Sequence, residues 1–266
     1  PLMDMEMIQY HPTTLAGKGF LITEGARGEG AHLLNAKGER FMERYAPNKM
    51  ELASRDVVSR AEQTEINEGR GVGPNGEGIY LDITVVPKKR TLEALREIVN
   101  IGKDFAGVDI TAEPIMIRPG QHYIMGGVKT DIWGRVPGVD GLYAAGEVAC
   151  VSVHGGNRLG ANSLLDTLIF GRRSGEDAAK RAAGMAMPSI SDARLGEDVA
   201  WIDGIIGRDK SGRRISEIKD ELGTELNRNV AVFREEAGLQ SARDTVKRLK
   251  EVPKPAYIDD RGAICN

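Results

Sequence analysis

The sequence has 266 residues, a formal net charge of -3 at pH 7 and an isoelectric point near 5.9. This length allows one or two domains with a sizeable core. The mildly acidic composition argues against a nucleic-acid-binding surface, which usually needs an excess of basic residues. The two cysteines, Cys150 and Cys265, lack metal-type spacing, so neither a disulfide framework nor a metal site is expected. No apolar run approaches the length of a membrane span.

The first predicted elements are a strand and a capped helix. Residues 5–10 read as a strand that enters His11, which is biased toward an extended conformation by the proline after it. A helix is expected from 55 to 68, with Ser54 as a plausible N-cap and Gly69 as a plausible stop.

The other elements follow from hydrophobic spacing and from glycine and proline positions. In chain order they are a turn and short helix at 38–46, a glycine-rich loop at 69–78, a strand at 79–84, an amphipathic helix at 91–105, an extended segment at 108–120, a hairpin at 122–131, a strand at 139–145, a helix at 162–183, a linker at 188–196, and helices at 201–207, 213–236 and 239–252.

The most informative stretch is 145–166, which reads AGEVACVSVHGGNRLGANSLLD. A strand that feeds a polar, glycine-rich loop into a helix N-terminus is suited to gripping an anionic cofactor or substrate. Glu147 can accept a hydrogen bond from a sugar-type hydroxyl, and Arg158 offers a planar fork suited to a carboxylate. A short piece of this stretch would be interpreted as an ordinary turn with one exposed arginine. The whole stretch of 22 residues, 145–166, favours a binding loop instead.

This stretch resembles the flavin-and-substrate signature of the flavoprotein subunits of succinate dehydrogenase and fumarate reductase. Three further blocks fit in the same order: QYHPTTLAGKGFLITEGARGEGAHLLN, GERFMERYAPNKMELASRDVVSRA and QHYIMGGVKTD. The chain is identified as a member of this family, closely over its first two thirds and more loosely after them. Family members begin with a Rossmann-type region in which GxGxxG opens a helix after a strand. The glycines of the loop at 69–78 do not open a helix, and no such region begins this sequence, so an internal fragment is expected and targeting signals cannot be judged.

The resemblance implies an α/β fold with an interrupted FAD-binding domain. Residues 1–10 and 122–187 would belong to the FAD-binding domain. A capping domain, 11–121, would be inserted between them, and a helical domain, 188–266, would follow. The active site would lie where the cap meets the FAD-binding domain.

The implied reaction is reversible oxidation of succinate to fumarate by hydride transfer with FAD. For proton transfer, the resemblance implies Arg55 as the proton donor or acceptor, with Glu24 and Arg27 as a proton relay. For substrate binding, it implies His11, Thr23 and Glu24 at one carboxylate and His122 and Arg158 at the other. The implied cofactor contacts are Glu147, His154, Asn162, Ser163 and Leu164.

Two of these residues can also be weighed on their own. A lone histidine such as His11 is more often structural than a ligand contact. Arg55 would sit at the first helical position, where the helix dipole disfavours a cation, and this invites a functional reason. Arginine is normally far too weak an acid for proton transfer, so a catalytic role needs a desolvated site crowded with positive charge. Without the family, Arg55 reads as a solvated residue at a helix start.

The resemblance also implies an iron–sulfur subunit as partner and, through it, membrane anchor subunits and quinone. The location would be the cytoplasmic face of a bacterial or archaeal membrane, or the mitochondrial matrix side. FAD is often covalently attached in this family, through a histidine upstream of this chain. L-Aspartate oxidase is the nearest alternative, although CVSVHGGNRLGANSLLD and RDVVSRA favour the succinate and fumarate branch. The other alternative is an inactive fragment with a role only in assembly.

Overall fold

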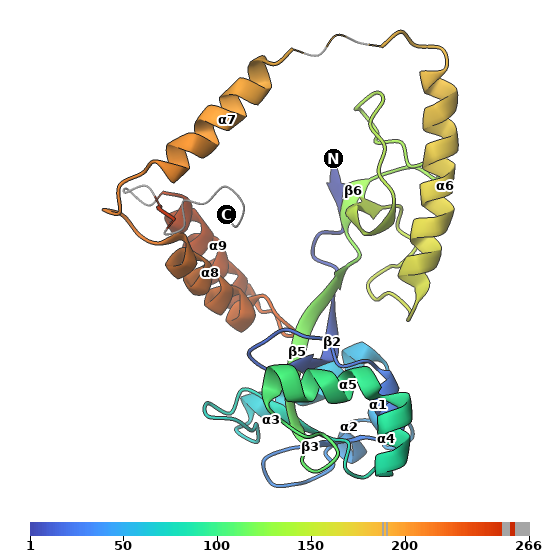
Figure 1. Cartoon of the computed structure of the whole chain (residues 1–266), viewed down its shortest axis with the longest axis vertical. Helices are drawn as coiled ribbons and strands as arrows, with labels where there is room; N and C mark the ends of the chain where they lie inside the picture. The colour runs from blue at the N-terminus through green and yellow to red at the C-terminus, as the bar shows by residue number, and fades with distance from the viewer. Residues whose placement is uncertain (188, 190, 252–255, 259–266) are drawn as a thin grey trace. The chain divides into compact units, whose positions relative to one another are not determined.

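The computed structural model describes residues 1–187, 189, 191–251 and 256–258. The chain divides into two compact units, Pro1–Met185 and Ala186–Asn266, which Figure 1 shows with their helices and strands. Helices and strands both contribute to the first unit, and the elements described in the second unit are helical. Cys265 lies outside the described residues, whereas Cys150 is buried as a free thiol.

The larger sheet of the first unit is antiparallel, with the order β2-β5-β4-β3. Its strands are β2 (Ile8–Leu15), β3 (His32–Leu34), β4 (Ile79–Asp82) and β5 (Ile115–Ile124). Alternate apolar side chains of β3, β4 and β5 point into the core, as the two-residue period of a strand requires: Leu33, Ile79, Leu81, Ile115 and Ile117. Strand β2 pairs irregularly with β5, with a register shift between Gln9 and Tyr10 and another between His11 and Thr14.

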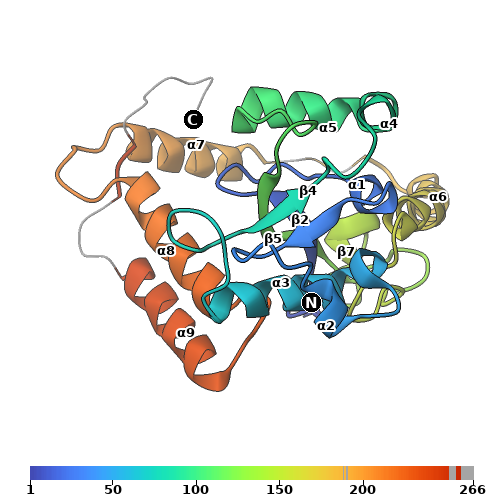
Figure 2. The same cartoon turned by 90° about the horizontal axis from the view of Figure 1, so that it is seen from below.

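Helices cover both faces of this sheet. Figure 2 shows α3 (Arg55–Asn67) on one face and α4 (Lys88–Ala94) and α5 (Arg96–Ile101) on the other. The shorter elements are α1 (Gly25–Gly28), α2 (Met42–Tyr45), η1 (Met50–Leu52) and η2 (Gly102–Ala106). Val58 and Ala61 of α3 and Ile98 and Val99 of α5 are buried in one hydrophobic core with the strands, so apolar burial holds the three layers together.

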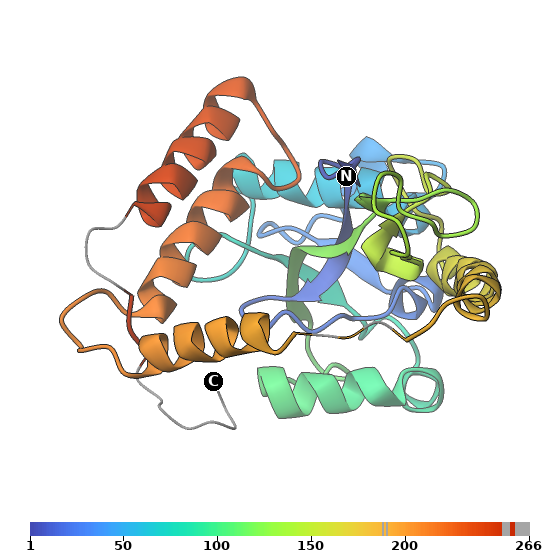
Figure 3. The same cartoon turned by 90° about the horizontal axis from the view of Figure 1, so that it is seen from above.

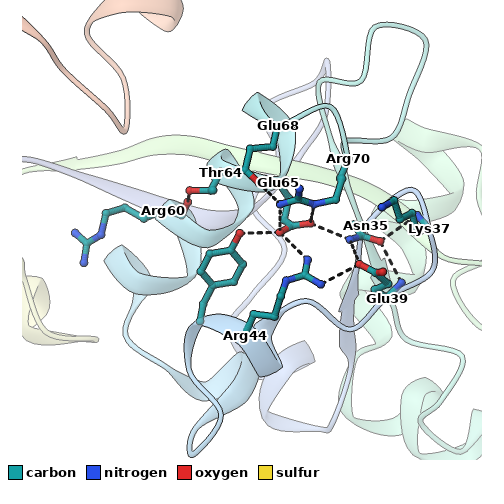
Figure 4. Close-up of polar contacts among 10 residues, drawn as sticks. Asn35, Lys37, Glu39, Arg44, Arg60, Thr64, Glu65, Glu68 and Arg70 are labelled. Carbon is teal, nitrogen blue, oxygen red and sulfur yellow. Dashed lines mark hydrogen bonds and ion pairs between the residues drawn. The ribbon is translucent and has the colours of Figure 1, made fainter.

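A cluster of charged residues ties α3 to the elements around it (Figure 4). The buried carboxylate of Glu65 accepts hydrogen bonds from Asn35 (2.8 Å), Arg44 (2.8 Å), Tyr45 (2.7 Å) and Arg70 (2.6 and 2.8 Å). Burial alone would raise the pKa of Glu65, but these hydrogen bonds outweigh it and hold the pKa well below its usual value. The cluster fixes α3 relative to α2 and to the loop after β3.

A smaller sheet forms the other part of the first unit, with the order β1-β6-β7. Its strands are β1 (Leu2–Met3), β6 (Gly127–Lys129) and β7 (Ala149–Cys150). The chain passes from β5 to β6 at Gly126, where an added Cβ would lie 2.1 Å from the carbonyl oxygen of Asp4, so only glycine fits there. The segment η3 (Gly146–Val148) precedes β7, and α6 (Asn162–Ala182) follows the glycine-rich loop.

The second unit contains α7 (Ala193–Ile206), α8 (Ile215–Asn229) and α9 (Glu236–Lys250). Helices α8 and α9 lie side by side (Figure 3). Polar contacts join them: Ser241 donates to Glu225 at 2.7 Å, and Arg248 pairs with Glu221. The two helices therefore form a helical hairpin, which these polar contacts at its surface help to stabilise.

Several sequence predictions are confirmed. Helix α3 begins at Arg55, after Ser54 at the N-cap position, and α6 begins at Asn162. A short helix at 42–45 and a strand at 79–82 also lie where they were expected. Ser54, however, makes no side-chain capping hydrogen bond.

The predicted hairpin at 122–131 is wrong. Strand β5 pairs with β2 as far as Ile124 and with β4 only at residues 115–117, and the residues that follow β5 do not fold back onto it. Strand β6 pairs instead with β1 and β7 in the smaller sheet. The turn residues were recognised, but the identity of the pairing strand depends on the whole sheet.

Other boundaries differ for local reasons. The single helix predicted at 91–105 is split at Leu95, which is buried with a non-helical backbone. The strand predicted at 139–145 is only an isolated bridge between Arg135 and Tyr143, since Gly138 and Gly141 have left-handed backbones that turn the chain.

The remaining differences lie at the ends of predicted segments. The first strand starts later than predicted and continues through the proline to Leu15. In the second unit, α7 starts within the predicted linker, α8 ends at Asn229, and α9 starts at Glu236. Residues 188 and 190 of the linker and residue 252, the predicted end of the last helix, lie outside the described residues.

Candidate active site

Gln9 joins two arginines that come from distant parts of the sequence. Its side-chain oxygen Oε1 accepts hydrogen bonds from Arg55 Nη1 (3.2 Å) and from Arg158 Nη2 (3.1 Å). Its Nε2 donates to Asn157 Oδ1 and to the carbonyl oxygen of Arg158, both at 2.6 Å. Gln9 is only 3% exposed. Strand β2, helix α3 and the glycine-rich loop therefore meet at one buried amide.

Sequence reasoning did not single out Gln9. The available signal was its position two residues before His11 on the same strand, because alternate residues of a strand share a face. Both residues are buried in β2. A polar amide on the buried face of a strand needs hydrogen-bond partners, which here are the two arginines and Asn157.

His122 and Arg158 lie together, as predicted. His122 Nε2 is 3.0 Å from Arg158 Nη2, and the rings of His11 and His122 meet edge-on with 5.2 Å between their centroids. The Arg158 guanidinium also stacks on the Tyr123 ring, 4.4 Å from its centroid, in a cation–π contact. Its buried Nε has no hydrogen-bond partner among the described residues. Arg158 is thus held on several sides and keeps a donor for a ligand.

Arg55, Glu24 and Arg27 also lie close together. Arg55 Nε donates to Glu24 Oε2 at 3.1 Å, and Arg27 Nη2 lies 3.8 Å from the same oxygen. The Arg27 side chain is fully buried and donates from Nη1 to the carbonyl oxygen of Glu51. The Glu24 side chain is 49% exposed. A single carboxylate therefore lies between two guanidinium groups.

Thr13 orients His11. The Thr13 backbone N–H lies 3.3 Å from His11 Nδ1 as a donor, and the Thr13 hydroxyl donates to the carbonyl oxygen of Ile22 at 2.6 Å. Because Nδ1 accepts a hydrogen bond, the neutral ring carries its proton on Nε2. Thr23, the predicted substrate contact, accepts a hydrogen bond from the backbone of Gly25 at 3.3 Å, in an exposed setting at the start of α1.

The site has an excess of positive charge. Burial, followed by the charges of Arg55, His122, Arg27 and Arg158, lowers the pKa of His11 to about 2. Burial and then the charges of Arg55 and Arg158 lower the pKa of His122. Both imidazoles are therefore neutral at pH 7, and the field around them favours a bound anion.

The predicted cofactor residues are at the start of α6 and near it. Glu147 Oε1 accepts a hydrogen bond from the backbone of Ile124 at 3.2 Å. His154 points into the protein: its Nε2 is 3.2 Å from Asp166 Oδ2, and Asn162 Nδ2 is 3.5 Å from its Nδ1. Asp166 and Tyr123, which also contacts His154, were not identified from the sequence.

The surface beside these residues fits FAD. Helix α6 begins after Ala161, which has a left-handed backbone and makes no side-chain capping hydrogen bond. Apolar side chains are exposed around this helix start, among them Leu164 at 69%: Val148, Val153, Leu164, Leu165 and Leu168. An apolar surface next to an uncapped helix N-terminus suits an aromatic ring system that carries negative charge.

Two features are absent from the described part of the chain, a metal-type cluster and a helix that could span a membrane. There, no three residues among the histidines, cysteines, aspartates and glutamates are grouped so that they could hold a metal ion. Among the residues that the structure describes, no helix is both long enough and apolar enough to cross a bilayer.

Comparison with known proteins gives the family. Residues 1–164 match the family model described as an FAD binding domain. The mitochondrial succinate dehydrogenase [ubiquinone] flavoprotein subunit of Oryza sativa subsp. japonica is 44% identical over 277 residues, which cover 100% of this chain and 44% of that protein. The 8-methylmenaquinol:fumarate reductase flavoprotein subunit of Wolinella succinogenes is 43% identical over 254 residues, covering 93% of this chain and 41% of that protein.

Solved structures with a similar fold come from the same group of enzymes. A quinol-fumarate reductase with menaquinol molecules matches with a TM-score of 0.89 and 37% identity, over 100% of this chain and 48% of that chain. Mycobacterium smegmatis Sdh1 in complex with UQ1 matches with a TM-score of 0.78 and 35% identity, over 97% of this chain and 43% of that chain. The chain spans about half the length of the proteins it matches. It belongs to the FAD binding domain family and is homologous to the flavoprotein subunits of succinate dehydrogenase and fumarate reductase.

Proposed function

We propose that the full-length protein is a flavoprotein subunit that interconverts succinate and fumarate with FAD. The observation that carries this proposal is the pair Arg55 and Arg158, both bonded to the Gln9 oxygen, beside two neutral histidines. A substrate with two carboxylates would neutralise this positive charge, and planar guanidinium groups suit carboxylates.

Substrate binding would use both sides of the cluster. His11 and Thr23, with Glu24 in a mixed role, would contact one carboxylate, and His122 and Arg158 would contact the other. The contact between Arg158 Nη2 and His122 Nε2 supports a shared carboxylate, because it brings the two side chains close enough to meet one group. The unpaired Nε of Arg158 supports the same assignment, because a buried donor normally finds a partner.

Proton transfer would depend on Arg55. Arg55 would hold or remove the proton at the substrate carbon, and Glu24 and Arg27 would relay it. The contacts Arg55–Glu24 and Glu24–Arg27 support this order. Burial lowers the pKa of Arg27, the buried guanidinium of the proposed relay. FAD, when bound, supplies the acceptor or donor for the hydride.

The cofactor contacts would come from the loop before α6 and its first turn. These residues are Glu147, His154, Asn162, Ser163 and Leu164. The exposed apolar surface and the uncapped start of α6 support them. The side chain of His154 is buried, and it would support the cofactor site through its contacts with Asn162 and Asp166.

The domain boundaries would be those of an interrupted FAD-binding domain. Residues 1–10 and 122–187 would form that domain, 11–121 the inserted cap, and 188–266 the helical domain. The arrangement of the first unit in two sheets supports the insertion, because the smaller sheet pairs β1 with β6 across the whole cap segment.

The partners would be an iron–sulfur subunit and, through it, membrane anchor subunits and quinone. The relatives support a multisubunit complex, since they are named as flavoprotein subunits and two of the names include a quinone or quinol. The protein would then be peripheral, on the cytoplasmic face of a bacterial or archaeal membrane or on the matrix side in mitochondria.

The test is dye reduction by the FAD-loaded full-length protein, with succinate and L-aspartate assayed in parallel and malonate added as a competitor. Succinate turnover that malonate blocks is the expected result. Turnover of L-aspartate without succinate turnover would contradict the proposal and would assign the protein to the oxidase branch of the family.

A further inference from the structure

Asp56 directly follows the proposed proton donor but has no part in the proposed reaction. It lies in the first turn of α3, and its two carboxylate oxygens contact different elements. Oδ2 pairs with Arg60 of the same helix at 2.7 Å, and Oδ1 accepts a hydrogen bond from Nδ2 of Asn157 at 3.1 Å. Asp56 and Asn157 are 101 positions apart, so this contact joins the start of α3 to the glycine-rich loop before α6.

Asp56 determines how the Asn157 amide is turned. Burial would raise the pKa of Asp56, but its contacts with Ser54 and Arg60 outweigh burial and lower the pKa, so the side chain is a carboxylate at neutral pH. An ionised carboxylate can only accept hydrogen bonds, whereas an amide has one end that donates and one that accepts. Asn157 therefore turns its Nδ2 to Asp56, and its Oδ1 is left for Gln9.

The Gln9 amide follows the same polarity. Its Nε2 donates to Asn157 Oδ1 at 2.6 Å, and the carbonyl oxygen of Arg158 accepts from the same nitrogen. Its other end, Oε1, thereby faces the guanidinium groups of Arg55 and Arg158, which can only donate. If Asn157 were turned over, its Nδ2 would meet the N–H groups of Gln9, and a buried donor would lose its partner.

We propose that Asp56 is a positioning residue that holds Arg55 at the substrate through two linked amides. These are the amides of Asn157 and Gln9. This inference rests on the proposed function. Asp56 itself exchanges no proton with the substrate; a partly exposed carboxylate sets which end of a buried amide faces the arginine.

The two arginines should not depend equally on this chain of contacts. Arg158 is held in addition by the Tyr123 ring and by the carbonyl oxygen of Leu159, to which it donates at 3.2 Å. Nη1 of Arg55 donates to Gln9. A loosened Gln9 amide should therefore disturb proton transfer by Arg55 more than carboxylate binding by Arg158.

The first experiment measures succinate turnover and the Kd of malonate for the FAD-loaded full-length protein. D56A should lower kcat by about tenfold, since a misplacement of about 1 Å can cost roughly a hundredfold in rate, and should leave the Kd of malonate almost unchanged. D56N keeps an oxygen that can accept from Asn157, so it should recover part of the loss. Wild-type kcat in D56A would overturn the inference, and so would a malonate affinity that falls as much as kcat.

The matched control is R60A. It removes the ion pair with Asp56 but leaves the contact between Asp56 and Asn157 in place, so it should keep the wild-type kcat. A loss in R60A equal to that in D56A would assign the effect to the ion pair and would overturn the inference. The melting temperature and flavin absorbance of each variant separate a loss of folding from a loss of kcat.

The second experiment is a double-mutant cycle with N157A. Because Asp56 acts through Asn157, N157A should lower kcat by a similar factor, and D56A/N157A should lower it no further than either single variant. Losses that multiply in the double variant would show that the two residues act independently and would overturn the inference. A wild type that oxidises no succinate would instead contradict the proposed function, and the positioning role would fail with it.

Discussion

At the scale of single residues, Gln9 explains how two guanidinium groups can be kept close together. One amide oxygen accepts a hydrogen bond from Arg55 and another from Arg158. A buried acceptor that bonds to two charged donors stabilises both, because hydrogen bonds to charged groups are stronger than neutral ones. Burial, and after it the positive field that results, lowers the pKa of the neighbouring imidazoles and keeps them neutral.

Arg55→Ala should abolish succinate turnover while FAD remains bound. The proposed proton donor is lost, and acid–base groups contribute about 10²–10⁴-fold to rate. Dye-reduction kinetics and the flavin absorbance of the purified variant measure the two effects. Arg60→Ala is the matched control, since Arg60 is an exposed arginine on the same helix that pairs with Asp56. Wild-type turnover in the Arg55 variant would refute the proton assignment.

Arg158→Ala should instead weaken dicarboxylate binding. Truncating one partner of a buried charged contact costs about 2–5 kcal/mol, and the loss should appear in the Kd of malonate measured by calorimetry. Arg172→Ala, at an exposed pair with Glu176, should leave that Kd unchanged. An equal malonate affinity in the Arg158 variant and wild type would exclude Arg158 from the site.

The burial of Glu62 predicts how the stability of the fold depends on pH. Its pKa is raised in the fold from an ordinary value of 4.5, so the stability contributed by its proton is complete below that value. This stability is lost as the pH rises toward the folded pKa, by up to about 1.4 kcal/mol per pH unit. The melting temperature of E62Q relative to wild type should therefore increase with pH. A difference independent of pH would show that Glu62 titrates normally in the fold.

At the scale of elements, α3 contributes to both the proposed active site and the core. Arg55 lies at its N-terminus beside Gln9 and Glu24, Glu62 lies in its buried middle, and Glu65 holds its last turns to α2 and to the loop after β3. The position of Arg55 thus depends on contacts up to three turns away. The contact between α3 and β2 completes the arrangement, because β2 carries Gln9 and His11.

Glu65→Ala should destabilise the first unit strongly. It removes the acceptor shared by Asn35, Arg44, Tyr45 and Arg70, and breaking a buried ion pair from one side costs about 3–5 kcal/mol. Chemical denaturation measures the loss. Glu68→Ala, which removes only the exposed pair between Glu68 and Arg70 just after the helix, is the control.

The same carboxylate predicts how acid affects the first unit. The pKa of Glu65 is lowered in the fold, so its contribution to stability is present above 4.5 and is lost as the pH falls. The difference in stability between wild type and Glu65→Ala should therefore shrink in acid. A constant difference would contradict the role of the charged form.

At the scale of the whole molecule, the apolar surface at the start of α6 predicts how this chain behaves alone. The Rossmann-type region expected of the family is not part of the given sequence, and the leucines at the helix start are exposed. The chain as given should bind FAD weakly or not at all, and it should be inactive by itself. Flavin fluorescence titration checks this, with the full-length protein as the comparison, and a Kd in the micromolar range or tighter would contradict the expectation.

Local signals in the sequence were sufficient for the starts of two long helices and for the family. The starts of α3 and α6 were predicted because apolar spacing and the residues that flank a helix act within a few positions. The family was identified from four blocks of residues in a constant order, and the comparisons agree with it. The chain alone thus determined that an FAD-binding domain is present and which polar residues are candidates for its site.

Tertiary structure decided the contacts that combine those residues into a site. Gln9 and Arg158 are 149 positions apart, and no local pattern reports which distant side chain will satisfy a buried amide. The hairpin prediction failed for the same reason, since β6 pairs with β1 and β7, which are distant in sequence, and not with β5. The burial of Glu62 was likewise invisible, because its place on α3 looks like any polar helix position until the sheet packs against it. Burial and long-range pairing are properties of the folded chain, and they set the charges and pKa values on which the chemistry depends.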